Sequence, residues 1–395
     1  MSAIQIARDT FWVGVKDPDL PVFDIIMKTE SGTTYNAYLV KGTEKTVLIE
    51  TVKANFAEEY FANLAEQVDV ARVDYLVVNH TEPDHSGAIV KLLEKNPNIE
   101  IICSAACIPF INNVINREAK ITGVKDNFEI DLGDKKMVFK TMPYMHWPDT
   151  MMEFVPETGV LFSCDGFAAH ISADTIYADE LPADKLEHEV DYYYDVIMRP
   201  FAFFIGKNLK KLEEFDIKMI APSHGPIFRQ DPGRQIEHYA KWSADKSEGK
   251  KQATILYASA YGNTGKVAQA IAAELKPHGW DTVLLDVAEM DPDKARDEIE
   301  AAKLILFGTP TFNGDAVKPV WDAVNLLSTV HSQGKKAAVF GSYGWSGEGP
   351  KLVAERLAGL RVKVFEENYR ARLVPSEEDL AEVKRFTAKL LDFVG

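Results

Sequence analysis

The chain has 395 residues, of which 46% are hydrophobic and 26% are charged, as is usual for a globular protein in water. This length exceeds what one ordinary hydrophobic core supports, so two domains are expected. The net charge of -16 argues against nucleic-acid or anionic-membrane partners. Three irregularly spaced cysteines, no apolar run of bilayer length and no signal-peptide pattern at the N-terminus indicate a cytoplasmic protein.

The first half of the chain, to about residue 248, has the pattern of a sheet-based α/β domain. Phe56, Tyr60, Phe61 and Leu64 recur at helical spacing and predict a helix after residue 49. Residue types able to bind metal follow several strand-like runs, which predicts a site at one edge of the sheets of a sandwich. Runs rich in β-branched and aromatic residues predict strands at 11–15, 34–40, 46–49, 73–78, 100–104, 136–141, 160–163 and 219–221.

The densest group of metal-binding residue types directly follows the predicted strand 73–78. Residues 80–85 read His-Thr-Glu-Pro-Asp-His, a spacing that directs side chains to two neighbouring metal positions. The mixture of imidazole and carboxylate favours a redox-active ion such as iron over an all-nitrogen zinc site. So many polar groups beside a buried strand would be costly without metal or ion pairing, although a single histidine near proline is usually structural. With three later residues that also follow strand-like runs, the candidates are His80, Glu82, Asp84, His85, His146, Asp165 and His224.

A change to small and charged residues at 242–251 predicts a short linker. Beyond it, predicted strands at 253–258, 281–287, 303–308, 336–341 and 361–366 alternate with helices, one marked by Val267, Ile271 and Leu275. This alternation predicts a doubly wound parallel sheet. Domains are therefore expected at 1–248 and 252–395.

Three loops at strand ends of the second half form a candidate flavin site. Residues 259–265 combine hydroxyls, an amide and glycines at the start of a helix, which suits a phosphate. Their spacing matches neither a Rossmann nor a P-loop motif, and it resembles the FMN-phosphate loop of flavodoxins. The loops 308–314 and 341–349 follow the third and fourth strands, where aromatic side chains can shield the isoalloxazine ring. The candidate FMN-binding residues are Ser259, Ala260, Tyr261, Gly262, Asn263, Thr264, Pro310, Thr311, Phe312, Asn313, Gly314, Ser342, Tyr343, Gly344, Trp345, Ser346 and Gly347.

The order of the metal-binding residues resembles the metallo-β-lactamase fold, with Glu82 where hydrolytic zinc members usually carry histidine. Together with the flavodoxin-like half, Glu82 makes almost the whole chain similar to the flavodiiron proteins, or A-type flavoproteins. The resemblance implies an αββα sandwich with two irons, then a flavodoxin-like parallel sheet of order 2-1-3-4-5 with FMN. It implies one iron on His80, Glu82 and His146, a second on Asp84, His85 and His224, and a bridge by Asp165. Family members differ in whether the histidine matching His85 is bound.

Two further residues are expected beside the substrate by the same resemblance, His170 and Tyr193. Several family members have a histidine and a tyrosine near these positions. Many relatives have Gly-Thr where this chain has Ala168 and Ala169, so the local loop is expected to differ. A purely structural role is the alternative for both residues, and three consecutive tyrosines leave the register of Tyr193 open.

The resemblance implies an oxidoreductase that reduces O2 to water, NO to N2O, or both. Electrons would pass through FMN from a rubredoxin-like donor or a reduced deazaflavin coenzyme. Because the two sites lie in separate domains, it also implies a head-to-tail homodimer or a dimer of dimers. Two alternatives stay open, a metal-dependent hydrolase of the lactamase or glyoxalase II type and a flavodoxin-type electron carrier with an inactive metal site.

Overall fold

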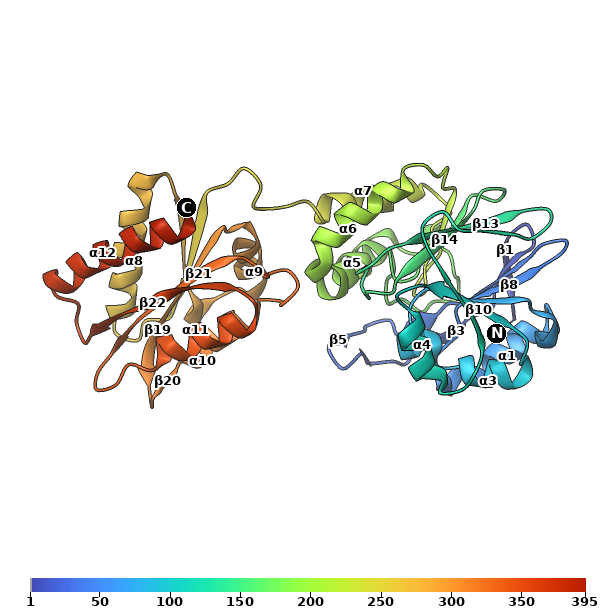
Figure 1. Cartoon of the computed structure of the whole chain (residues 1–395), viewed down its shortest axis with the longest axis horizontal. Helices are drawn as coiled ribbons and strands as arrows, with labels where there is room; N and C mark the ends of the chain where they lie inside the picture. Colours follow the sequence, from blue (N-terminus) through green and yellow to red (C-terminus); the bar gives the residue numbers. More distant parts are fainter. Residues whose placement is uncertain (1) are drawn as a thin grey trace. The chain divides into compact units, whose positions relative to one another are not determined.

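The structure is a computed structural model that describes residues 2–395 in two compact units, one ending at Ala244 and the other beginning at Asp245 (Figure 1). This division falls within the predicted linker 242–251. Each unit has its own hydrophobic clusters, and no cluster contains residues of both. Among the described residues, no helix is long and apolar enough to cross a membrane.

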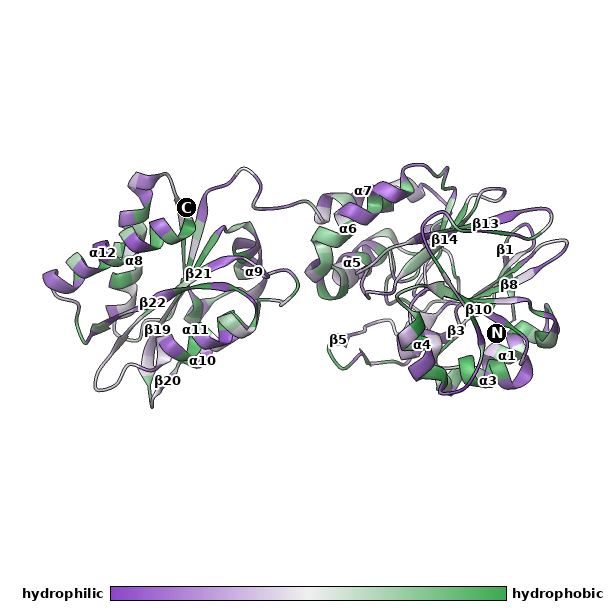
Figure 2. Cartoon of the chain, viewed as in Figure 1, coloured by the Kyte–Doolittle hydropathy of each residue, from purple (hydrophilic) through white to green (hydrophobic). Residues whose placement is uncertain are grey.

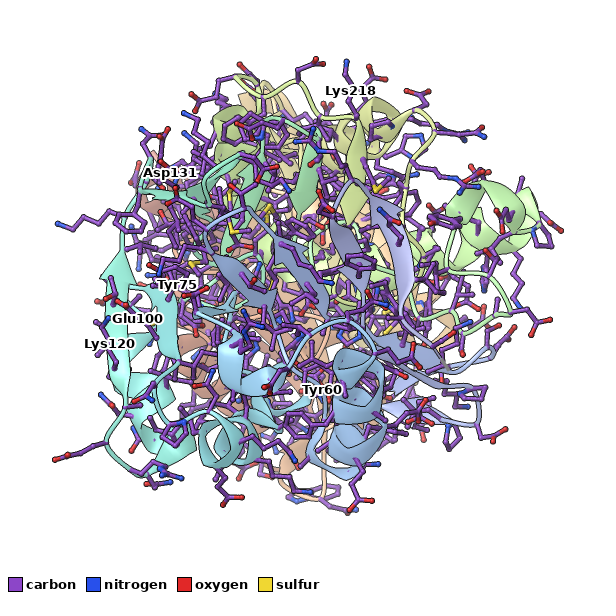
Figure 3. All side chains as sticks on the ribbon, turned by 90° about the vertical axis from the view of Figure 1, so that its right-hand side faces the viewer. Tyr60, Tyr75, Glu100, Lys120, Asp131 and Lys218 are labelled. Atoms are coloured by element: carbon purple, nitrogen blue, oxygen red, sulfur yellow. The ribbon has the colours of Figure 1, made fainter. Side chains whose placement is uncertain are left out.

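The first unit begins with a seven-stranded sheet in the order β1-β2-β7-β8-β9-β10-β11. Its strands pair antiparallel from β1 to β8 and parallel from β8 to β11. Tyr75, Glu100 and Lys120 are register partners across the last three strands, and Glu100 pairs with Lys120 (Figure 3). The strands are β1 (Ile4–Ala7), β2 (Thr10–Trp12), β7 (Tyr38–Lys41), β8 (Thr46–Ile49), β9 (Tyr75–Val78), β10 (Glu100–Ser104) and β11 (Lys120–Val124).

A five-stranded sheet packs against the first through a core that includes Trp12, Tyr38, Phe139 and Phe162. The outer faces of the two sheets are covered by helices, so the unit is the expected αββα sandwich (Figure 1). The second sheet consists of β12 (Glu129–Asp131), β13 (Lys136–Thr141), β14 (Met151–Val155), β15 (Val160–Phe162) and β16 (Met219–Ala221). The longer helices are α1 (Ala57–Ala65), α3 (Ile89–Lys95), α4 (Ile108–Ile115), α5 (Ala183–Tyr193), α6 (Ala202–Leu209) and α7 (Pro232–Trp242).

The predicted strand 34–40 differs from the structure, which has two short strands there. β6 (Thr33–Tyr35) pairs with β3 (Val15–Asp17), whereas β7 joins the large sheet. Asn36 lies between them and is buried, where its amide donates to the carbonyls of Pro222 and Gly225. Its side-chain oxygen accepts from Trp12. These side-chain bonds replace the ladder bonds that a continuous strand would need at this point.

The second unit contains a parallel sheet in the order β18-β17-β19-β21-β22, which is the expected 2-1-3-4-5. Figure 2 shows its central strands β19 and β21 as mostly hydrophobic, whereas hydrophilic and hydrophobic residues alternate along helix α12. The strands are β17 (Gln252–Tyr257), β18 (Asp281–Asp286), β19 (Leu304–Phe312), β21 (Lys336–Tyr343) and β22 (Lys363–Arg372), with β20 (Asp315–Ala316) antiparallel to the end of β19. The helices are α8 (Asn263–Leu275), α9 (Pro292–Ala301), α10 (Lys318–Val324), α11 (Gly349–Gly359) and α12 (Glu377–Val394).

Glu153 on β14 is a fully buried acid whose carboxyl group has one hydrogen bond among the described residues, received from the side-chain amide of Asn79 at 3.0 Å. Burial raises its pKa well above the usual carboxyl range. The folded protein therefore keeps a proton on Glu153 that the unfolded chain releases above its ordinary pKa. The free energy of unfolding consequently falls by about 1.4 kcal/mol for each pH unit between the ordinary and the raised pKa.

Glu153→Gln is expected to remove this loss, because the amide is neutral at every pH. The variant should gain stability relative to the wild type as the pH rises from 5 to 8. Guanidinium unfolding of both proteins across that range measures the difference. A difference that stays constant with pH would contradict a protonated Glu153.

Candidate metal centre and flavin site

The candidate metal residues are placed by the ends of four strands in the first unit. His80 follows β9, and Glu82 precedes the short helix α2 (Pro83–Ser86), whose first residue is Pro83. Proline is favoured there because a backbone N–H at the first position of a helix has no partner within the helix, so the N–H that proline lacks is not needed. The remaining residues lie on α2 or after β13, β15 and β16, namely Asp84, His85, His146, Asp165 and His224.

His80, Glu82, His146 and Asp165 form the first group, with one possible ligand atom from each within 4.8 Å of the others. The Nε2 atoms of His80 and His146 lie 3.1 Å and 3.0 Å from Oδ2 of Asp165. The same two nitrogens lie 3.4 Å and 3.5 Å from Oε2 of Glu82. Two imidazole nitrogens thus face two carboxylate oxygens, one from each acid.

Asp84, His85 and His224 form the second group. Oδ2 of Asp84 lies 3.3 Å from Nε2 of His85 and 3.1 Å from Nε2 of His224. The other oxygen of Asp165, Oδ1, lies 3.3 Å and 3.5 Å from the same two nitrogens. Asp165 therefore faces the first group with one oxygen and the second group with the other, and all seven predicted residues come together.

The electrostatics of this site are dominated by buried acids opposite imidazoles. Burial alone would raise the pKa of Asp165, but His85 and His80 lower it well below its usual range. Burial would lower the pKa of His85, but Asp84 and Asp165 raise it well above its usual range. The acids are thus anionic and ready to bind a cation.

The donor set fits two metal ions rather than a network of hydrogen bonds. Both oxygens of Asp84, Oδ1 of Asp165 and Nε2 of His85 are buried atoms without a hydrogen-bond partner. Buried polar atoms left unpaired are costly, so atoms that converge in this way indicate a missing cation. Three carboxylates with four imidazoles suit iron, whose ferric state anionic oxygens stabilise.

His170 and Tyr193 lie beside the second group. The ring of His170 lies 5.2 Å from that of His224 and 5.0 Å from that of Tyr193, centre to centre. Its Nδ1 is 2.8 Å from the hydroxyl of Thr33, whereas its Nε2 is buried without a hydrogen-bond partner. Burial, followed by the neighbouring His224, lowers the pKa of His170 well below its usual range, so the ring is neutral.

Several residues near the site were missed by the sequence analysis because they belong to no motif. Thr33 contacts His170, and the ring of Phe23 lies 4.1 Å from that of His170. Asp24 hydrogen-bonds to Glu82, and burial together with this bond raises the pKa of Asp24 to about 7. Glu50 lies 3.3 Å from His85. Of these residues, only Glu50 could have been proposed from the sequence, since it directly follows β8, a strand parallel to β9.

The candidate flavin residues gather at the C-terminal edge of the parallel sheet in the second unit. Gly262 adopts a positive φ of 79° just before helix α8, a conformation that favours glycine. The hydroxyls of Thr264 and Ser342 hydrogen-bond at 2.8 Å and thereby join the first and third loops. Thr311 accepts from the backbone N–H of Gly349, which joins the second and third loops. All three predicted loops therefore meet at one edge.

The second and third loops are shorter than predicted, because β19 continues to Phe312 and β21 to Tyr343. The register pairs Thr309 with Gly341 and Pro310 with Ser342, so the ladder extends past the expected strand ends. Tyr261 and Trp345 nevertheless stand out with 85% and 81% of their surface exposed. Exposed aromatic rings beside a helix N-terminus fit a site for a phosphate joined to a planar ring system.

Thr264→Val should weaken FMN binding at least about tenfold, because a lost hydrogen bond to a charged group costs about 1.5–3 kcal/mol. Valine has nearly the same shape but cannot donate to a phosphate. FMN content after dialysis and the dissociation constant from flavin fluorescence measure the loss. Iron content serves as the control and should not change. Unaltered FMN affinity would contradict a phosphate at the start of α8.

Comparison with known proteins agrees with this arrangement. The ODP family beta lactamase model matches residues 33–225, and the flavodoxin model matches residues 255–386. The flavo-diiron protein FprA2 of Clostridium acetobutylicum is 37% identical over 393 residues, which cover 98% of each chain. The nitric oxide reductase of Moorella thermoacetica is 35% identical over 382 residues, which cover 95% of each chain.

A solved structure, rubredoxin oxygen:oxidoreductase of Desulfovibrio gigas, is similar over 100% of this chain and 98% of its own. The TM-score is 0.70 and the sequence identity 29%. Both the sequence relationship and the fold thus extend over both domains. The chain therefore belongs to the flavodiiron, or type A flavoprotein, family.

Proposed function

We propose that this flavodiiron protein reduces O2 to water, NO to N2O, or both. The observation that carries the proposal is the position of Asp165, whose two oxygens face two separate groups of candidate ligands. When bound, two irons and FMN can together supply the four electrons that reduction of O2 to two waters consumes. The names of two relatives, nitric oxide reductase and rubredoxin oxygen:oxidoreductase, support the two substrates.

The seven side chains would divide between the two irons according to the groups they form. His80, Glu82 and His146 would hold one iron, Asp84, His85 and His224 would hold the other, and Asp165 would bind both. Each iron would then have one carboxylate of its own, Glu82 or Asp84, besides the shared one, which favours the ferric state. The cluster of unpaired buried atoms supports this assignment.

His170 would donate a hydrogen bond to the substrate or to a product leaving the site. Because its ring is neutral, it carries one proton, and the hydroxyl of Thr33 would donate to Nδ1 at 2.8 Å rather than to the more distant Thr34 carbonyl at 3.3 Å. The ring proton then lies on Nε2, the buried atom without a partner. Tyr193 packs against this ring and would hold it in place.

Electrons would reach the FMN from a reduced protein such as a rubredoxin, or from a reduced deazaflavin coenzyme. The site at residues 259–264, 310–314 and 342–347 would hold the flavin with its phosphate at the start of α8. We further propose a head-to-tail homodimer, alone or paired into a tetramer, in which FMN of one subunit serves the irons of the other. Three free, buried cysteines support a cytoplasmic location.

Iron and FMN content followed by gas consumption tests the proposed function directly. The purified protein should contain two irons and one FMN per chain and, once reduced without air, should consume O2 or NO. Parallel measurements with O2 and NO electrodes would establish the preferred substrate. The hydrolase and electron-carrier alternatives are not favoured, since Glu82 and the flavodoxin domain are both present. Zinc in place of iron, or no consumption of either gas, would contradict the proposal.

A further inference from the structure

Two consecutive residues directly after β8, Glu50 and Thr51, contact His85. The backbone N–H of Thr51 donates to the carbonyl of His85 at 3.0 Å, and the hydroxyl of Thr51 donates to the same oxygen. Oε2 of Glu50 lies 3.3 Å from Nδ1 of the His85 ring. Both side chains are 1% exposed. The end of one strand thus contacts the backbone and the ring of His85 together.

Glu50 is itself fixed in this position. Its backbone has a φ of 62°, a left-handed conformation that few residues other than glycine adopt. The backbone N–H of Asn79 donates to Oε1, and the hydroxyl of Tyr60 donates to the Glu50 carbonyl. Oε2 has no hydrogen-bond partner and lies 3.3 Å from Nδ1 of His85, while His80 and Cys164 each have a possible ligand atom within 4.8 Å of a Glu50 oxygen. A strained residue with one buried oxygen directed at an imidazole is more often functional than accidental.

The opposite side of the His85 ring faces the metal site. Nε2 has no hydrogen-bond partner and lies 3.3 Å from both Asp84 and Asp165. An imidazole whose Nδ1–H faces a carboxylate keeps its lone pair on Nε2, where it can bind a metal. His224, the other histidine of this group, has the backbone carbonyl of Thr34 at 2.7 Å from its Nδ1. Glu50 therefore supplies to His85 the stronger of the two acceptors.

We propose that Glu50 is a positioning residue that holds His85 as a ligand of the second iron. This inference rests on the proposed diiron function and concerns His85, whose binding the resemblance leaves open. Glu50 contacts no substrate and acts only through the ring of His85. Its carboxylate, 3.3 Å from Nδ1, would fix the orientation of that ring and make Nε2 a more basic ligand.

Glu50→Leu is expected to lower the affinity for one of the two irons by about 10- to 100-fold, the usual effect of removing such a partner. Chelator competition measures the affinity, and circular dichroism together with an unchanged affinity for the other iron reports correct folding of the first unit. Glu153→Gln is the matched control, because Glu153 is also buried and bound to Asn79 but contacts no candidate ligand. The control should keep both iron affinities.

A double-mutant cycle separates positioning from a structural role. If Glu50 acts through His85, then Glu50→Leu should cost no further iron affinity in a His85→Asn background. Additive losses would overturn the proposal. Glu50→Gln provides a milder test, since its amide oxygen can still accept from Nδ1. Mössbauer spectra of the protein loaded with iron-57 should then change for one iron only, and two unchanged sites would count against the proposal.

The outcomes distinguish this inference from the function on which it rests. A wild-type protein without iron would overturn both. Two tightly bound irons and normal gas reduction in the wild type, with the same iron affinities in Glu50→Leu, would overturn only the role of Glu50.

Discussion

Asp165→Asn is expected to deprive the protein of bound iron and of gas reduction while FMN remains in place. Asp165 is the one candidate ligand whose two oxygens face different groups, at 3.0–3.1 Å from His80 and His146 and at 3.3–3.5 Å from His85 and His224. An asparagine side chain has one weak acceptor oxygen and one NH2 group, which cannot bind a cation. It could therefore serve at most one iron, and without negative charge.

O2 or NO reduction is expected to fall by more than about 100-fold. A loss of about 100-fold is typical when a hydrogen-bond partner of a metal ligand is removed, and Asp165 is itself a candidate ligand. Iron per chain, FMN per chain and turnover are measured on the same preparation. Asp174→Asn is the matched control, because it makes the same chemical change at an exposed residue a short distance along the chain. A variant with two irons and wild-type turnover would show that the two groups of ligands do not share Asp165.

The seven candidate ligands, which the structure brings together, could be picked out in the sequence because they are dense and follow strands. β15 and β16 are parallel neighbours, so the side chains just beyond them emerge at the same edge of the five-stranded sheet. β9 belongs to the other sheet, and the residues after it meet them because the two sheets pack face to face. The local sequence of the hexapeptide 80–85 also fixes part of the site, since Asp84 and His85 are adjacent residues on the single turn of α2. For these residues local sequence and tertiary fold agree, which makes the prediction reliable.

The residues behind the ligands could not be found in the same way. Thr33 and Phe23 lie on short strands that a pattern search cannot separate from loops, and their contact with His170 spans more than 130 residues of chain. Asp24 lies beside Phe23 and hydrogen-bonds to Glu82, which is 58 residues further along the chain. Such pairings depend on how the first strands fold over the sheets, which hydrophobic periodicity does not specify.

The flavin loops are an intermediate case. Their positions after the first, third and fourth strands follow from the alternation of strands and helices. The residues at which these loops begin do not follow from that alternation. Thr309 and Pro310 continue the hydrogen-bonded ladder with β21, although proline and glycine usually mark the end of a strand. Proline is tolerated here because β17 pairs with β19 only as far as Gly308, so at Pro310 this side of the strand has no β17 partner.

Cutting the chain at Gly249 is expected to leave each half with its cofactor but to slow donor-driven turnover. Gly249 is exposed, has a positive φ of 71° and has no atom near the position of an added Cβ. The hydrophobic clusters lie wholly on one or the other side of this residue. Each half therefore has the core that it needs to fold, and a protease site inserted there should be accessible.

The size of the effect follows from effective concentration. In the proposed dimer the linker of each chain keeps its flavin domain near the irons of the partner subunit, at an effective concentration of about 1 mM. Cut halves mixed at about 1 µM should therefore meet roughly a thousandfold less often. The same protein before cleavage is the control, with iron and FMN measured in both samples. The first half alone should not accept electrons from the donor, because it lacks the flavin domain. Turnover by that half at the rate of the intact protein would contradict the passage of electrons through FMN.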